Sequence, residues 1–163
     1  MRRMRAILGV LVCALVLAPT ALAAGRDTVT VTGEASQGLF PSIGGIDIHA
    51  SSGPRGQGAR GSVTFFTDSF VTYTGKVTCM RVEGNTAILN FRGTVTDYFT
   101  GAFIRRGIYA LQFVDNGGAP DIDGYGTDTI GFGGPYVGQD CRPVSLQSYA
   151  LALGRAVVVD MDR

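Results

Sequence analysis

The chain has 163 residues and a formal net charge of +1, with 45% hydrophobic and 17% charged residues. This length suits one compact domain, and the hydrophobic content excludes intrinsic disorder as the main state. The low charge density excludes a long ion-paired helical or coiled-coil protein. The near-neutral balance gives no electrostatic signature of nucleic-acid binding.

Residues 1–23 have the pattern of a secretory signal peptide. Arginines at the start precede an uncharged run over 6–18, and Ala21 and Ala23 form a small-x-small cleavage site. The run is shorter than the roughly 20 residues that span a bilayer, which makes an uncleaved anchor the weaker alternative. We therefore expect 24–163 to be one secreted or envelope-associated domain with no membrane span after cleavage. Without the leader arginines, 11 basic residues face 13 acidic ones, so the net charge becomes −2.

Two cysteines, Cys79 and Cys141, remain after cleavage. Export would place them in an oxidising compartment, where one intramolecular disulfide is the expected outcome. Two buried free thiols or a redox pair are the alternatives, and the long separation argues against a redox pair, which usually shows C-x-x-C spacing.

Apolar and polar residues alternate with period two along most of the exported chain, as in half-buried strands. In chain order, this pattern covers 27–33, 45–50, 71–79, 87–96 and 108–115, and 156–160 reads as a closing strand. Gly84-Asn85 fits a type II′ hairpin turn, whereas 51–61 reads as a Gly-rich loop and 99–107 as a longer connection or bulged hairpin. Residues 146–153 are the only stretch that suggests a short helix.

These elements predict an all-β, single antiparallel domain of about eight strands with at most one short helical turn. Gly75 and Gly93 lie mid-strand on the apolar face, where glycine marks a bend or a close backbone approach. Because tightly curled barrels use such glycines as kinks, we expect a small closed barrel rather than a two-sheet sandwich.

One part of the chain resembles a known group of proteins. Residues 75–87 read GKVTCMRVEGNTA, with GSVTF at 61–65 and VDNG at 114–117. This order resembles small secreted bacterial β-domains of uncharacterised function that share a G-x-V-T-C-x-x-V-x-G-N-x-A core and a D-N-G loop. The resemblance covers about residues 60–160. It implies a β-domain with a secreted or surface location, and it carries over no catalytic residue.

The acidic loop 115–128 is the best candidate for a metal site. Asp121, Asp123 and Asp128 lie among glycines, and calcium prefers oxygen ligands that a flexible loop can wrap around it. The EF-hand pattern fails, because Tyr125 and Phe132 stand where ligands are required. A solvated turn stabilised by Asp and Gly is the alternative interpretation.

Two further motifs carry possible chemistry. His49, the only histidine, alternates with Asp47 on one strand face, which fits an exposed strand residue better than a catalytic triad or a zinc site. Arg105 and Arg106 lie in a segment with Phe103, either as a binding lip for an anionic or aromatic ligand or as solvated cations. The absence of Trp and the single Lys argue against carbohydrate or nucleic-acid binding.

The sequence thus favours a non-enzymatic secreted or envelope domain with a structural or binding role. A carrier for a small apolar ligand is the first alternative, with Tyr73, Phe91, Tyr109 and Phe113 lining a barrel cavity. A barrel enzyme of unidentified chemistry is the second. A cell-surface component or a small apolar ligand would be the partner, with no nucleic acid and no cofactor other than the calcium candidate.

Overall fold

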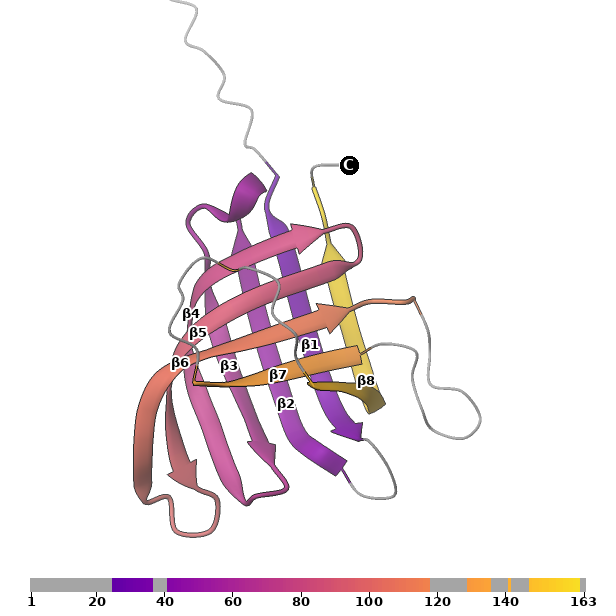
Figure 1. Ribbon diagram of the computed structural model, residues 1–163. Helices are drawn as coiled ribbons and strands as arrows, with labels where there is room; N and C mark the ends of the chain where they lie inside the picture. Colours follow the sequence, from indigo (N-terminus) through magenta and orange to yellow (C-terminus); the bar gives the residue numbers. More distant parts are fainter. Residues whose placement is uncertain (1–24, 37–40, 118–128, 136–140, 142–146, 162–163) are drawn as a thin grey trace, which may run out of the picture.

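The computed structural model describes residues 25–36, 41–117, 129–135, 141 and 147–161. These residues form one closed antiparallel barrel in which eight strands follow one another in chain order and β1 pairs with β8 (Figure 1). The strands are β1 Asp27–Ser36, β2 Pro41–Ser52, β3 Arg60–Thr67, β4 Val71–Glu83, β5 Thr86–Asp97, β6 Phe103–Val114, β7 Thr129–Pro135 and β8 Gln147–Val159, with a 3-10 turn, η1, at Pro54–Gly56. The closed barrel confirms the predicted fold class.

Strand alternation places one row of side chains inside and the next row outside. In β1, Val29 and Val31 are buried whereas Thr32 is exposed, because successive side chains of a strand point to opposite faces. The four aromatics predicted to face inward, Tyr73, Phe91, Tyr109 and Phe113, are all buried in the core.

The aromatic rings inside the barrel pack on one another. Phe65 stacks on Tyr73 with ring centroids 4.8 Å apart, and Tyr73 meets Tyr109 edge-on at 5.1 Å. Phe91 lies 5.3 Å from Tyr109. These separations lie within the range of favourable aromatic pairs, so these side chains fill the middle of the barrel with one another.

One sequence prediction of local structure is corrected, and two hairpin predictions are confirmed. The helix suggested at 146–153 is wrong, because residues 147–153 belong to β8, which pairs with β7 and β1 and closes the barrel. The periodicity of a short apolar run fits a helix as well as a strand, and here the hydrogen-bonded pairing with the neighbouring strands shows that it is a strand. Of the two alternatives for 99–107, the bulged hairpin is confirmed, because β6 begins at Phe103 and its register with β5 shifts between Val95 and Thr96. The hairpin at Gly84-Asn85 is present, with Gly84 at φ 64° as a II′ turn requires.

A row of glycines crosses the inner face of three strands. Gly75 pairs with Gly93, and Gly93 pairs with Gly107. A Cβ atom at Gly93 would lie 2.7 Å from the carbonyl oxygen of Thr74 and 2.8 Å from the ring of Phe91. The glycines therefore leave room for the buried rings and let the sheet curl, as the sequence predicted.

The two ends of the barrel differ. At the end that carries the termini, three carboxylates accept backbone amides from other segments: Asp160 from Gly84 (2.8 Å), Asp115 from Val158 (3.0 Å) and Asp27 from Met161 (3.0 Å). The opposite end, here called the aromatic end, carries the turns 68–70 and 98–102, which lie low in Figure 1. The backbone amide of Tyr98 donates to the carbonyl of Phe70 (2.8 Å) and ties these two turns together.

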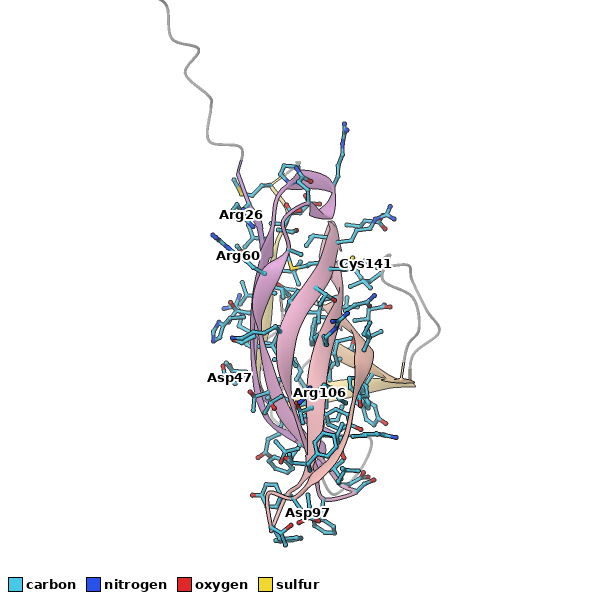
Figure 2. The ribbon with its side chains drawn as sticks, turned by 90° about the vertical axis from the view of Figure 1, so that its left-hand side faces the viewer. Arg26, Asp47, Arg60, Asp97, Arg106 and Cys141 are labelled. Atoms are coloured by element: carbon cyan, nitrogen blue, oxygen red, sulfur yellow. A yellow bond between two sulfur atoms is a disulfide. The ribbon has the colours of Figure 1, made fainter. Side chains whose placement is uncertain are left out.

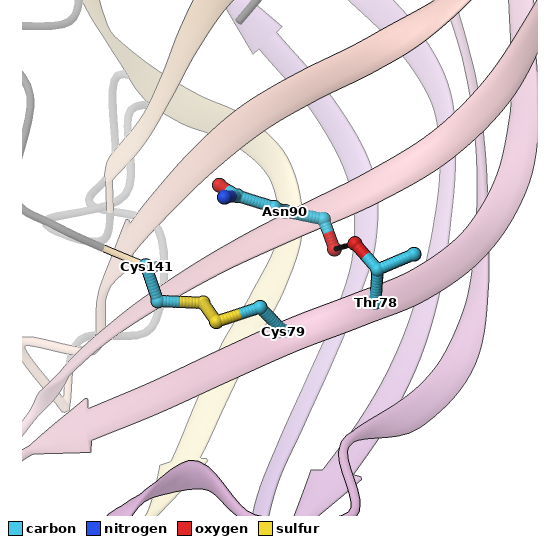
Figure 3. The surroundings of a disulfide bond; sticks show 4 residues. All are labelled: Thr78, Cys79, Asn90 and Cys141. Carbon is cyan, nitrogen blue, oxygen red and sulfur yellow. Dashed lines mark hydrogen bonds between the residues drawn. A yellow bond between two sulfur atoms is a disulfide. The ribbon is translucent and has the colours of Figure 1, made fainter. Parts of the chain in front are cut away.

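Cys79 and Cys141 form a disulfide with Cα atoms 5.9 Å apart, which confirms the predicted pairing (Figure 3). The bond ties β4 to Cys141, a residue between β7 and β8 in the sequence. Asn90 lies beside it, and the hydroxyl of the neighbouring Thr78 donates to the carbonyl of Asn90 (3.3 Å). The disulfide is thus part of a buried layer on the outer surface of β4 and β5.

Candidate functional site

The calcium candidates Asp121, Asp123 and Asp128 lie outside the described residues. Asp115, at the start of the same acidic segment, is described, and its two carboxylate oxygens accept the amides of Gly117 (2.9 Å) and Val158 (3.0 Å). This carboxylate is therefore engaged in holding β8 at the end of the barrel. Among the described residues, no three His, Cys, Asp or Glu side chains gather as metal ligands would.

His49 lies on the outer face of β2, where its Nε2 is 3.0 Å from Oδ1 of Asp47. The side chains are 58% and 66% exposed, so this is a solvated surface pair. Ser52, at the end of the same strand, is buried and alternates to the other face. The histidine is an exposed strand residue, as the alternation predicted.

Arg105 and Arg106 are neighbours in β6 but point to opposite faces. Arg105 pairs with the buried Val95, which in turn pairs with Tyr73. Residues opposite one another on antiparallel strands share a face, so Arg105 belongs to the inner row. Arg106 pairs with Thr94 and faces outward. The two arginines therefore belong to two separate sites.

The outer face of β3–β6 carries a line of cations. Arg60, Lys76, Arg92 and Arg106 border two adjoining shallow hollows that share Ser62 and Lys76. Lys76 pairs with Ser62 on one side and with Arg92 on the other. We call this surface the basic groove; Figure 2 shows Arg60 towards the end with the termini and Arg106 nearer the aromatic end.

The charges of the basic groove are not balanced from within the described structure. None of its four cations forms an ion pair with a described acidic residue. The salt bridges among the described residues are His49–Asp47 and Arg81–Glu83. Lys76 and Arg92 stand directly opposite each other, an arrangement that destabilises a sheet. Threonine and serine side chains and glycines line much of the rest of the hollows, and His49, the partner of Asp47, borders the first of them. An anion bound here would relieve the repulsion and meet hydroxyl hydrogen-bond partners.

A second polar cluster lies on the inner face near the aromatic end. A hydrogen bond from Arg105 to the hydroxyl of Tyr73 raises the pKa of the guanidinium. Tyr109 lies one further step along the inner row of β6, beyond Gly107, and its hydroxyl is 3.2 Å from where a Cβ of Gly107 would stand. The Tyr109 hydroxyl therefore points back along β6 toward Arg105.

The hydroxyl of Tyr109 is buried and lacks a hydrogen-bond partner among the described residues. Burial raises the pKa of Tyr109, and the positive charge of Arg105 opposes that rise. Arg105 approaches this hydroxyl without a hydrogen bond of regular geometry. The cluster is thus rich in donors and contains one buried donor that is not satisfied.

The aromatic end also exposes large apolar side chains. Five of them are between 47% and 72% exposed: Phe70, Tyr98, Phe99, Phe103 and Ile104. The rings of Phe70 and Phe99 lie 5.2 Å apart, and those of Tyr98 and Phe99 5.3 Å apart. The rings of Phe70, Tyr98 and Phe99 therefore form one exposed aromatic cluster at this end.

Sequence reasoning identified Arg105 and Arg106 but missed the basic groove. Arg60, Lys76 and Arg92 are far apart in the sequence, and only strand register aligns them. The only sequence feature that could have indicated the groove is that these residues occupy the polar positions of alternating strands. Many solvated residues occupy such positions, so this feature does not single them out.

Comparisons with known proteins add no relative: no family model, no curated protein and no solved structure matches the chain. Within the described residues, no helix is long and apolar enough to cross a membrane.

Proposed function

We propose that this protein is a non-enzymatic, exported binding domain whose basic groove holds an anionic polysaccharide of the cell surface or its surroundings. The observation that carries the proposal is the line of four cations without described acidic partners, with Lys76 and Arg92 directly opposed. Such a pair costs stability unless an anion accompanies it.

The chemistry of the groove favours a polysaccharide over other polyanions. Hydroxyl groups accompany the cations in both hollows: those of Thr28, Thr30 and Ser51 in the first, those of Thr64, Thr74 and Thr94 in the second, and that of Ser62 in both. Hydroxyl and amide groups can share hydrogen bonds with sugar hydroxyls, while the cations neutralise sulfate, phosphate or carboxylate groups. The residues that line the two hollows include no Phe, Tyr or Trp, whereas single-stranded nucleic acids are usually held by such stacking platforms. The absence of Trp also argues against carbohydrate recognition by ring stacking, but the contact proposed here uses charge and hydrogen bonds, which need no aromatic ring.

The basic groove offers a binding surface that the barrel interior does not. Phe65, Tyr73, Phe91 and Tyr109 occupy the interior with rings in mutual contact. A carrier function would require these rings to separate around a ligand, which would expose their packed faces. We therefore favour binding at the outer face over carriage of an apolar ligand inside.

The test measures binding of residues 24–163 to dextran sulfate, with uncharged dextran as the control polymer. We expect salt-dependent binding to dextran sulfate and none to dextran. The double variant Lys76→Gln/Arg92→Gln should weaken binding about tenfold or more and flatten the salt dependence, because two cations no longer displace counterions.

Arg155→Gln is the matched control, since Arg155 is an exposed cation on β8, outside the hollows. It should change the affinity by less than about twofold. Because the double variant removes two positive charges and the control removes one, equal losses per charge removed would mean that only overall charge matters, and the proposal would be wrong. Binding of dextran as tight as that of dextran sulfate would also contradict it.

A further inference from the structure

We propose that Arg105, Tyr73 and Tyr109 form a second binding site, which takes a carboxylate carried on an aromatic or other apolar body. The site lies on the inner face near the aromatic end, and it is independent of the basic groove on the outer face.

Strand register brings the three polar groups together. Tyr73, Val95 and Arg105 form one row across β4, β5 and β6. Tyr109 follows on the same face of β6, and its ring meets that of Tyr73 at 5.1 Å. Gly107, between the two β6 residues, has no side chain to separate the Tyr109 hydroxyl from Arg105.

Arg105 is exposed although it belongs to the inner row. The reason lies in the ladder, because β7 pairs with β6 only over Tyr109–Val114. Within the described structure no strand pairs with residues 103–108 on that side, so solvent and solutes reach the guanidinium. A ligand can therefore meet Arg105 without opening the packed core, whereas contact with the buried Tyr109 hydroxyl requires the exposed Arg105 side chain to move aside.

No described acidic residue forms an ion pair with Arg105. Arg105 brings several N–H donors, and the buried hydroxyl of Tyr109 has no acceptor among the described residues. Of the acids at this end, Asp97 accepts from the Thr100 amide and hydroxyl, both at 2.8 Å, and Asp68 lies close enough to Tyr149 to raise the pKa of that phenol. A carboxylate on Arg105 would accept from the guanidinium in a bidentate manner and satisfy a phenol donor.

The aromatic rings around the cluster indicate what kind of molecule would carry the carboxylate. The rings of Phe65 and Phe132 pack beside the cluster, and the ring centroids of Phe132 and Tyr73 lie 5.0 Å apart. At the same end of the barrel Phe99 and Phe103 are 72% and 62% exposed. One cationic group among aromatic rings fits a singly charged, aromatic acid better than a polyanion.

The test uses benzoate as the probe, with benzamide as its neutral counterpart and inorganic phosphate as the anion without a ring. Binding to residues 24–163 is measured by ligand-observed NMR. We expect saturable binding of benzoate that is about tenfold or more tighter than that of benzamide or phosphate, since the charge-assisted contact and the ring contact both contribute.

Two variants locate the site. Arg105→Gln should weaken benzoate binding about tenfold or more, and Tyr109→Phe should weaken it severalfold while keeping the ring in place. Arg155→Gln, which removes a charge on β8, should change the affinity for benzoate by less than about twofold. Thermal unfolding of each variant checks that the barrel is intact.

The proposal is overturned if benzoate does not bind saturably, if benzamide or phosphate binds as tightly, or if Arg105→Gln has no more effect than Arg155→Gln. Its failure is separable from that of the proposed function. Dextran sulfate binding without benzoate binding refutes the inner-face site alone, and the reverse result refutes the basic groove alone.

Discussion

Replacing Gly93 by alanine tests whether the glycine row is what lets the barrel close around its aromatic core. A Cβ at this position would lie 2.7 Å from the Thr74 carbonyl oxygen and 2.8 Å from Cε2 of Phe91, well inside ordinary van der Waals contact. Backbone cannot yield as a side chain does, so the cost is that of an overpacked core, about 1–3 kcal/mol. At an unstrained strand position the same change would stabilise the protein by about 0.4–1 kcal/mol.

Urea denaturation followed by far-UV circular dichroism measures this cost, with an unchanged m-value as the sign that the native state is preserved. Gly107→Ala is the matched comparison, because its Cβ would meet only side-chain atoms of Tyr109, at 3.2–3.4 Å. We expect it to cost less than about 1 kcal/mol, since the ring can move slightly. If the Gly93→Ala protein were as stable as the wild type, or less destabilised than Gly107→Ala, the glycine row would not be what lets the barrel close around its aromatic core.

Three further predictions concern the disulfide and the titrating groups. The variant Cys79→Ser/Cys141→Ser should lose about 4 kcal/mol of stability, because the bond closes a loop with a sequence separation of 62; unchanged unfolding in dithiothreitol would contradict this. The pKa of Asp97 is lowered by hydrogen bonds from the Thr100 backbone and side chain, so the ionised form stabilises the turn 98–102. That contribution is present above pH about 4 and is lost as the pH falls through the lowered pKa; amide hydrogen exchange of Thr100 should accelerate there, and less so in Thr100→Val. Burial raises the pKa of Tyr109 and of Tyr149, where Asp68 adds to the rise. The stability contributed by the protonated phenols is complete below pH about 10 and is lost as the pH rises through the raised values, so part of the tyrosinate absorbance should appear only on alkaline unfolding.

The period-two pattern was enough to predict most strands, because half-buried strands impose alternation on the sequence. The alternation over 71–79 and 87–96 corresponds to the central parts of β4 and β5, and Gly75 and Gly93 correctly indicated a curled sheet. Residues 146–153 misled because their apolar side chains fit a helix as well as a strand. These residues form a strand because they pair with β1 and β7, and such contacts between distant parts of the sequence cannot be inferred from the local pattern.

The candidate sites were less accessible to sequence reasoning. Register aligns Lys76 with Arg92 across two strands, and a bulged stretch of the β5–β6 ladder adjoins the pairing of Arg105 with Val95. A shift of one residue would exchange the faces of Arg105 and Arg106. Composition and motif spacing carry no information on such pairings. The sequence therefore left the two arginines as either one binding lip or solvated cations, and only the structure places them on opposite faces.

The most direct test of the basic groove is a 1H–15N NMR titration of residues 24–163 with a short sulfated oligosaccharide. We expect chemical-shift changes concentrated at the amides of Arg60, Ser62, Lys76, Arg92 and Arg106, with little change around Arg155 and Asp115. Shifts spread evenly over all exposed cations, or centred on the end that carries the termini, would contradict it.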